Sequence, residues 1–222
     1  MESKSYFDDV APQWDRLRKS FFSEAVRDKA LSVADVHPDR VAADIGCGTG
    51  FMTEGLIQRG LKVIAVDASS AMLSEMEKKF AGNNMIVCRQ GDAISLPIQD
   101  KSVDYAFANM YLHHVDVPRD AIKEMARILK PGGVLVITDL DEHHFEFLKS
   151  EHNDRWMGFL RSDIKRWLDD AGMEKIVIDC AGENCCASSS CGSECAEISI
   201  FIASGRRNFL GFEGDINARI AI

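Results

Sequence analysis

Short apolar runs alternate with amphipathic segments along the first two thirds of the chain. The apolar runs predict five strands, at residues 41–45, 62–66, 84–89, 103–108 and 133–138. The segments between them repeat apolar residues at helical spacing and predict helices at 50–59, 69–80 and 119–129. Alternating strands and helices form βαβ units, so the pattern predicts an α/β fold with a parallel sheet covered by helices on both faces.

The two ends of the chain carry different patterns. Residues 5–37 precede the first predicted strand and are expected to be helical, with an interruption at Pro12. After the fifth predicted strand, the pattern indicates a further amphipathic helix and then two more strands, at 161–172, 175–180 and 197–203. We therefore expect an N-terminal helical lid (1–40), a main domain (41–205) and a C-terminal tail without strong periodicity (206–222).

The net charge of the chain disfavours two classes of binding partner, nucleic acids and anionic lipids. The 222 residues include 26 Lys and Arg against 35 Asp and Glu, which gives a net charge of −9 with neutral histidines. An acidic surface argues against a nucleic-acid scanner and against docking on anionic lipid. No apolar run approaches the roughly 20 residues that span a bilayer, and the start of the chain shows no secretory signal. We expect a cytoplasmic protein with a small-molecule partner.

The strongest motif is DIGCGTG, which runs from Asp44 to Gly50 between the first strand and the following helix. Glycine has no Cβ and lets the backbone approach a ligand, while the helix start offers free N–H groups. A dinucleotide fingerprint needs G-x-G-x-x-G, but Phe51 stands at the third glycine position. Asp44 precedes the glycines, where it can bind a cationic amine or brace the loop. Both details disfavour NAD.

Two further acids follow the next strands. Asp67 ends the second strand and Asp92 comes just after the third. Parallel strands bring their carboxyl ends to one edge of the sheet, where α/β proteins bind ligands. A carboxylate at Asp67 can accept both hydroxyls of a ribose, and Asp92 can accept from an adenine amino group. The alternative is that each acid is only a helix cap or a turn residue.

These motifs together resemble those of the class I S-adenosylmethionine-dependent methyltransferases, of the methyltransferase-11 kind that act on small molecules. The matching segments are YFDDVAPQWD (6–15), DIGCGTG (44–50), VIAVDASSAML (63–73), GDAISLPI (91–98), DKSVDYAFANMYLHHV (100–115) and RILKPGGVLVITD (127–139). The resemblance implies a doubly wound Rossmann-like sheet with strand order 3-2-1-4-5-7-6 and strand 7 antiparallel. The runs at 175–180 and 197–203 fit strands 6 and 7.

The resemblance also implies S-adenosylmethionine as the cofactor and assigns its contacts. The methionine part would be held by Asp44, Gly46, Gly48 and Gly50, with Asn109 beside it. The ribose would bind Asp67. The adenine would be met by Ala68, Met72, Asp92 and Ala93.

Methyl transfer depends largely on positioning, and an oxygen or nitrogen acceptor also needs a base. His113 and His114 follow the fourth strand on the ligand side and are the candidate bases, although either could be a structural turn residue. A polar run after the fifth strand is either a metal or acceptor site or a solvated helix start: Asp139, Asp141, Glu142, His143 and His144. Phe7, Trp14 and Trp156 could close an acceptor pocket or belong to the core.

Five of the seven cysteines fall within residues 180–195, in the pattern C-x4-C-C-x4-C-x3-C: Cys180, Cys185, Cys186, Cys191 and Cys195. This Cys-rich loop would join strands 6 and 7 over the ligand face. Its thiolates could present a soft acceptor such as trivalent arsenic, hold a structural zinc or an iron–sulfur cluster, or stay free. Arsenite methyltransferases also carry a cysteine near the end of strand 4, which this chain lacks.

The sequence therefore predicts an enzyme that transfers a methyl group to a small acceptor. A thiolate-bound metalloid such as arsenite is the first acceptor to consider. One alternative is an ordinary small metabolite, with His113 or His114 as the base. A second is a non-catalytic metal-binding or sensor protein whose cysteine loop holds a structural metal.

Overall fold

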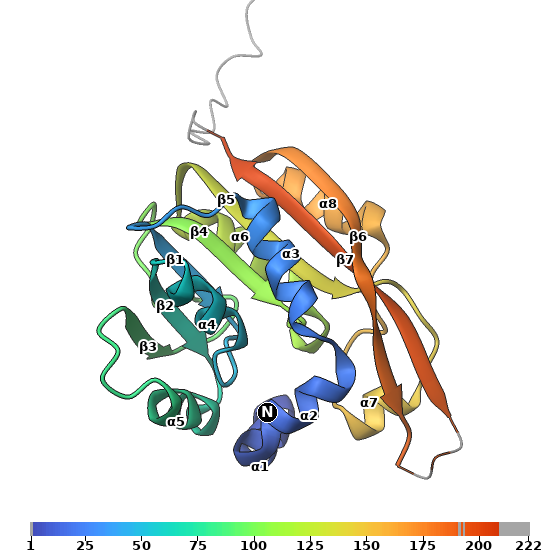
Figure 1. The fold of residues 1–222 in the computed structure, drawn as a ribbon. Helices are drawn as coiled ribbons and strands as arrows, with labels where there is room; N and C mark the ends of the chain where they lie inside the picture. The colour runs from blue at the N-terminus through green and yellow to red at the C-terminus, as the bar shows by residue number, and fades with distance from the viewer. Residues whose placement is uncertain (1, 191, 193, 209–222) are drawn as a thin grey trace, which may run out of the picture.

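The computed structural model describes residues 2–190, 192 and 194–208, and its centre is one seven-stranded sheet (Figure 1). The strands lie in the order β3-β2-β1-β4-β5-β7-β6. Their bounds are β1 Val41–Ile45, β2 Lys62–Asp67, β3 Ile86–Gln90, β4 Val103–Asn109, β5 Leu129–Leu140, β6 Met173–Ser188 and β7 Cys195–Arg207. β1 to β5 pair in parallel, and β7 is antiparallel to both of its neighbours. The predicted fold class and strand order are confirmed.

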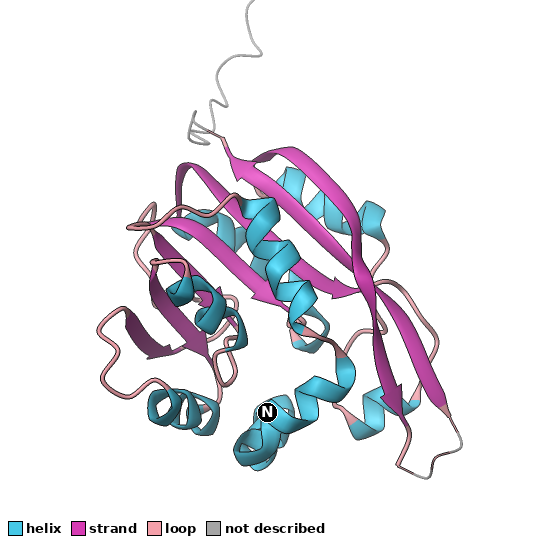
Figure 2. Cartoon of the chain, viewed as in Figure 1, coloured by secondary structure: helices cyan, strands magenta, loops and turns pink. Residues whose placement is uncertain are grey.

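Helices cover both faces of the sheet (Figure 2). One buried apolar cluster joins a sheet face to α3 (Glu24–Ala34), α4 (Phe51–Gln58) and α5 (Ser70–Lys79). A second cluster joins the other face to α6 (Pro118–Ile128) and α8 (Arg161–Asp170). The short helix α7 (Phe147–Glu151) and the 3-10 turn η2 (Leu112–His114) follow β5 and β4.

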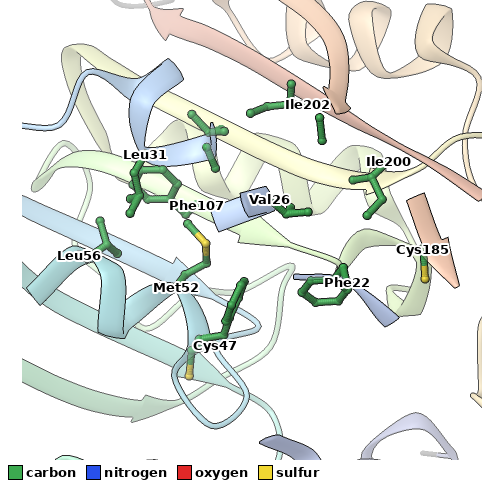
Figure 3. Packing of buried hydrophobic residues seen from close by; sticks show 14 of the residues in the cluster. Phe22, Val26, Leu31, Cys47, Met52, Leu56, Phe107, Cys185, Ile200 and Ile202 are labelled. Carbon is green, nitrogen blue, oxygen red and sulfur yellow. The ribbon is translucent and has the colours of Figure 1, made fainter. Parts of the chain in front are cut away.

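The central strands are buried on both faces, which explains their nearly continuous apolar sequence. In β4, Phe107 packs into the cluster that contains Leu31 and Leu56, whereas Ala106 packs into the opposite one. Figure 3 shows Phe107 among side chains of α3 and α4. Each fully buried side chain of this size contributes about 1.5–3 kcal/mol, so the core fixes the position of the strand ends.

Two element boundaries differ from the sequence prediction. α6 ends at Ile128 and β5 already begins at Leu129, ahead of Pro131. The irregular register between Val103 and Tyr105 of β4 accommodates this early start. α4 begins at Phe51, because Gly50 has a φ of 90° and acts as the N-cap.

Three short N-terminal elements precede α3: α1 (Glu2–Val10), the 3-10 turn η1 (Ala11–Gln13) and α2 (Trp14–Phe21). The predicted interruption at Pro12 is confirmed, since this proline lies in η1. Figure 1 shows α1 and α2 at the lower end of the sheet, where α1 contacts α5 and α2 contacts β6. The third helix, α3, belongs to the core of the domain through Val26 and Leu31.

The segment 180–195 is not a loop, contrary to the prediction. β6 continues to Ser188 and β7 begins at Cys195, so most of the segment forms a paired hairpin that extends past β5. Its pairing runs from Asn184–Ser199 to Ser188–Cys195. The hairpin forms because buried Ala187 alternates with exposed neighbours and packs with Ile198 in the same apolar cluster. Cys191 and most of the predicted tail (209–222) lie outside the described residues.

Candidate active site

A cavity of about 230 Å³ opens at the carboxyl ends of β1, β2 and β4. Nine of the ten predicted cofactor contacts line it: Asp44, Gly46, Gly48, Asp67, Ala68, Met72, Asp92, Ala93 and Asn109. The tenth, Gly50, lies behind this wall, where an added Cβ would come within 2.6 Å of the Phe80 ring. Gly50 therefore shapes the start of α4 rather than the cavity.

Asp44 braces the glycine loop against α4. Its Oδ2 accepts hydrogen bonds from the backbone N–H of Thr53 at 2.9 Å and from the Thr53 hydroxyl at 2.7 Å. Burial raises the pKa of Asp44 to about 6, the Thr53 hydrogen bonds oppose this rise, and the charge of Asp67 adds to it. No positive charge therefore balances an ionised Asp44 among the described groups that shift its pKa, and a cation bound in the cavity would stabilise this carboxylate.

Asp67 ties the same loop to the end of β2. Its Oδ2 accepts from the backbone N–H of Gly48 at 2.8 Å, and its Oδ1 accepts from that of Ser69 at 2.9 Å. Burial raises the pKa of Asp67 despite these hydrogen bonds. Each carboxylate oxygen has a second lone pair, so Asp67 retains the capacity to accept from ligand hydroxyls.

The remaining walls combine apolar surface with two polar groups. Met72 and Ala93 are buried and give the cavity an apolar side. Asp92 is exposed at its rim, with its Oδ1 accepting from the backbone of Ile94 at 3.2 Å. The Oδ1 of Asn109 accepts a hydrogen bond from Thr138 at 2.7 Å, which fixes the orientation of the amide.

The N-terminal helices close over the cavity through polar contacts with its rim. The Ser69 hydroxyl donates to Asp8 at 2.6 Å, and the Thr49 hydroxyl donates to Asp15 at 2.5 Å. Lys79 of α5 also binds Asp15, at 3.1 Å. The predicted pocket aromatics Phe7 and Trp14 line the cavity as a consequence.

Sequence reasoning missed several residues of the cavity wall, among them Tyr111, Arg18 and Phe22. Tyr111 lies against the glycine loop so closely that a Cβ at Gly46 would come within 2.1 Å of its ring. Arg18 and Phe22 line the cavity from α2 and the residue after it. The positions of Arg18 and Phe22 depend on how the N-terminal helices dock, and no local motif encodes this, whereas Tyr111 lies within the matching segment 100–115.

The two candidate bases have opposite electrostatic environments. Nδ1 of His113 lies 2.7 Å from Oδ1 of Asp139, which is fully buried. Burial alone would lower the pKa of His113, but the charges of Asp139 and Asp154 outweigh it and raise the pKa to about 9. Burial, and next the charge of His113, hold the pKa of His114 well below its usual value. His114 is therefore the neutral imidazole of the pair.

A second, smaller pocket of about 60 Å³ adjoins the cavity. Its walls are mostly apolar and aromatic: Tyr6, Phe7, Trp14, Phe21, Phe22, Met110, Leu140, Leu148, Cys185 and Ala187, together with His113, His114, His152 and Asp154. Among the described residues that line both spaces, His114 is the only titratable one. Trp156 lines neither; its indole donates to the Val115 carbonyl at 2.9 Å.

Comparison with known proteins decides the family. The sequence model of the methyltransferase domain family matches residues 43–137. A demethylmenaquinone methyltransferase of Renibacterium salmoninarum is 29% identical over 198 residues, which cover 80% of this chain and 82% of the relative. A malonyl-[acyl-carrier protein] O-methyltransferase of Marinomonas sp. is 32% identical over 62% of this chain and 54% of its own length. The chain belongs to the class I S-adenosylmethionine-dependent methyltransferases.

Solved structures show the same fold. The methyltransferase in complex with the Haloferax volcanii Trm112 methyltransferase activator superposes with a TM-score of 0.75. The two chains share 17% identity, and the match covers 91% of this methyltransferase and 97% of the other chain. No helix within the described part of the methyltransferase is long and apolar enough to cross a membrane.

The cavity of the methyltransferase fits S-adenosylmethionine. The cofactor carries a sulfonium cation, an amine, a ribose and an adenine. Asp44 offers a buried carboxylate and Asp67 a half-buried one, both with raised pKa values, and the loop has no side chain at Gly46 and Gly48. Met72 and Ala93 offer an apolar surface for a flat ring. The cavity wall therefore offers a matching group for the cationic part, the ribose and the adenine of the cofactor.

The cysteines of the methyltransferase point in different directions. Cys185 is buried in the smaller pocket, whereas Cys186 is exposed, since successive strand residues face opposite ways. Cys180 lies 3.7 Å from the Ser199 hydroxyl, and Cys195 lies 3.9 Å from that of Ser188. Among the described residues, no group of three or more neighbouring metal-ligand atoms contains a cysteine. The predicted thiolate metal site receives no support, and Cys191 lies outside the described residues.

The residues of the predicted polar run at the end of β5 have different surroundings. Asp139 is buried beside His113, whereas both oxygens of Asp141 accept from Arg161 at 2.7 Å. Within the described residues, Asp141, Glu142, His143 and His144 belong to no such group of neighbouring metal-ligand atoms. The smaller pocket is lined by residues of η2, the N-terminal helices, α7 and the hairpin, together with Leu140, His152 and Asp154.

Proposed function

We propose that this methyltransferase transfers a methyl group to a small aromatic acceptor held in the pocket beside the cofactor cavity. The observation that carries the proposal is the position of His114, which lines both spaces and is neutral at pH 7. In the proposed arrangement, the predicted contacts Asp44, Asp67 and Asn109 hold the cofactor. The N-terminal helices act as a lid that excludes water.

The proposed chemistry is a single displacement. Bound S-adenosylmethionine supplies an electrophilic methyl group on a sulfonium. The acceptor's oxygen or nitrogen forms the new bond to carbon, while the carbon–sulfur bond breaks and leaves its electron pair on sulfur. The acceptor's proton becomes strongly acidic as the new bond forms, so a neutral imidazole accepts it. His114 is the proposed base, and His113, paired with Asp139, positions it through η2.

The pocket indicates the class of acceptor. Tyr6, Phe7, Trp14 and Phe21 supply aromatic walls, which suit a flat apolar ring. The first relative is named for a quinone, demethylmenaquinone, and this supports a flat ring compound as the acceptor. We therefore propose a phenol- or quinol-type acceptor.

The geometry disfavours the metalloid acceptor that the sequence suggested. The pocket holds one described thiol, and burial, together with the charge of Asp154, raises the pKa of Cys185 to about 12. A protonated, single thiol is a poor ligand for trivalent arsenic, which requires thiolates. The other described cysteines do not line this pocket.

The test is methyl transfer from S-adenosylmethionine labelled in its methyl group. The acceptors compared are a naphthohydroquinone, a simple phenol, a primary amine and arsenite with a small thiol. Labelled product from the aromatic hydroxyl compounds is the expected result. Product from arsenite that disappears when Cys185 is replaced by Ser would instead restore the metalloid acceptor.

A further inference from the structure

Three polar side chains meet on the wall of the acceptor pocket, away from the predicted cofactor contacts. Nε2 of His113 and Nδ1 of His114 each lie 3.8 Å from Oδ1 of Asp154. The three atoms all lie within 4.8 Å of one another. The side chains of His113, His114 and Asp154 are 6%, 11% and 4% exposed. This is a compact, buried set of two imidazoles and one carboxylate.

The two imidazole nitrogens lie close to the Asp154 carboxylate but beyond hydrogen-bond distance. A separation of 3.8 Å is too long for a hydrogen bond between nitrogen and oxygen. The Asp154 carboxylate therefore faces both imidazoles without being hydrogen-bonded to either.

Ligand atoms of a metal ion have this kind of spacing. Bonds of about 2.0–2.2 Å to a tetrahedral zinc ion separate neighbouring ligand atoms by roughly 3.3–3.5 Å. The observed 3.8 Å therefore needs only a small closure around an ion. Two imidazoles and a carboxylate form a ligand set that zinc enzymes use while they keep a fourth position open.

The surroundings hold this set in place. The 2.7 Å contact of Nδ1 of His113 with Asp139 directs Nε2 toward Asp154, as the carboxylates behind metal-bound histidines do. The backbone N–H groups of Arg155 and Trp156 both donate to the His113 carbonyl, at 2.9 and 3.1 Å. These bonds fix the segment that carries Asp154 against η2. An ion at Nδ1 of His114 would replace only its 3.3 Å contact with the Asn153 carbonyl.

A further histidine faces the same pocket. His152 lines it, and both of its ring nitrogens are buried without a hydrogen-bond partner among the described residues. An ion in the pocket would give a bound water or acceptor oxygen that His152 can contact. The neighbouring charges include Asp139 and Arg155.

We propose that His113, His114 and Asp154 bind a divalent transition-metal ion, represented by Zn²⁺, with an open position toward the acceptor pocket. Binding of the ion is independent of methyl transfer. Its task rests on the proposed function: the ion would bind the acceptor's hydroxyl oxygen and lower its pKa, so that the acceptor reacts as an anion. In that state His114 is a ligand and not the base, and the acceptor releases its proton to solvent before the methyl group is transferred.

The experiment measures Zn²⁺ binding by titration calorimetry on the full chain without cofactor or acceptor. The background variant carries Ser at Cys180, Cys186, Cys191 and Cys195, which removes binding by those thiols. We expect one ion per chain, and Co²⁺ in its place is expected to show visible absorption of a four- or five-coordinate site. Cys185→Ser in this background is the matched control and is expected to retain binding.

The variants test each part of the site. Asp154→Asn, which keeps the size of the side chain, and His114→Gln are expected to weaken Zn²⁺ binding by more than about 100-fold, and Asp139→Asn by about 10- to 100-fold. Thermal unfolding confirms that each variant is folded. Absence of Zn²⁺ binding in the background variant, or an unchanged affinity in Asp154→Asn and His114→Gln, would overturn the proposal. Zn²⁺ binding without methyl transfer would leave the site standing and remove its proposed task.

Discussion

Oδ2 of Asp67 accepts a 2.8 Å hydrogen bond from the backbone N–H of Gly48. One carboxylate therefore joins the end of β2 to the glycine loop after β1, and it does so at the wall of the cavity. The same side chain organises the loop and is available to the cofactor.

Asp67→Ala is expected to weaken cofactor binding by at least about tenfold, because hydrogen bonds to a charged group contribute about 1.5–3 kcal/mol each. Calorimetric titration with S-adenosylhomocysteine measures the change. Asp120→Ala, an exposed acid on α6 that is paired with Lys123, is the control and is expected to bind normally. An unchanged affinity in Asp67→Ala would refute the assignment of the ribose contact.

Cofactor affinity is expected to fall in acid. The pKa of Asp44 is raised to about 6 in the free protein, so this carboxyl is ionised above pH 6 and protonated below it. A cationic ligand favours the ionised form; the dissociation constant therefore rises as the pH falls through 6, by up to about tenfold per unit. Titrations of S-adenosylmethionine between pH 5 and 8 test this. Asp44→Asn is expected to flatten the profile, and equal slopes in both proteins would exclude Asp44 as the cause.

The N-terminal helices are expected to control cofactor release. Asp15 binds both Thr49 and Lys79 across the cavity rim, so Asp15→Asn removes the charge that pairs with Lys79 and leaves one oxygen for the two donors. We expect faster dissociation, by about tenfold for a loss near 1.4 kcal/mol, with methyl-group chemistry otherwise intact. Stopped-flow measurement of cofactor release gives the rate. Asp9→Asn, on the exposed side of α1, serves as the control, and equal rates in the two variants would show that this contact does not hold the lid.

Asp139→Asn is expected to destabilise the fold by about 3–5 kcal/mol. Four donors surround this buried carboxylate: the N–H groups of Tyr111, Leu112 and Leu140 and the Nδ1 of His113. The amide side chain in Asp139→Asn has only one oxygen, so in either orientation its NH₂ group would face N–H donors and leave them without an acceptor. Chemical denaturation measures the loss, and Asp163→Asn, at a surface ion pair with Arg166, is expected to cost less than about 1 kcal/mol. A similar small loss for both variants would contradict this account.

The residues of the cofactor cavity could be predicted from the sequence because they lie in contiguous motifs at strand ends. Asp44, Asp67 and Asp92 follow three neighbouring strands, and strand order alone brings them to one edge. Gly50 was the exception, since a glycine in a motif can serve the helix start as well as the ligand. The order of the sheet was available through the resemblance of the same motifs.

The residues of the proposed acceptor pocket were harder to predict from the sequence, because tertiary contacts bring them together. Asp154 lies 40 residues after His114 along the chain, and tertiary contacts such as the backbone bonds from Arg155 and Trp156 to His113 bring it there. The cysteine segment reads as a loop because Gly182, Asn184 and a run of serines suggest turns. Cross-strand pairing with β7 overrides these local preferences.

The most direct test compares wild-type protein with His114→Ala in two assays, methyl transfer to aromatic hydroxyl acceptors and cofactor affinity. The account predicts that the variant binds S-adenosylhomocysteine within about twofold of wild type, while product formation falls by about 100-fold or more. Wild-type methylation rates in a His114→Ala variant, or no labelled product from wild-type protein that binds the cofactor, would contradict the proposed active site.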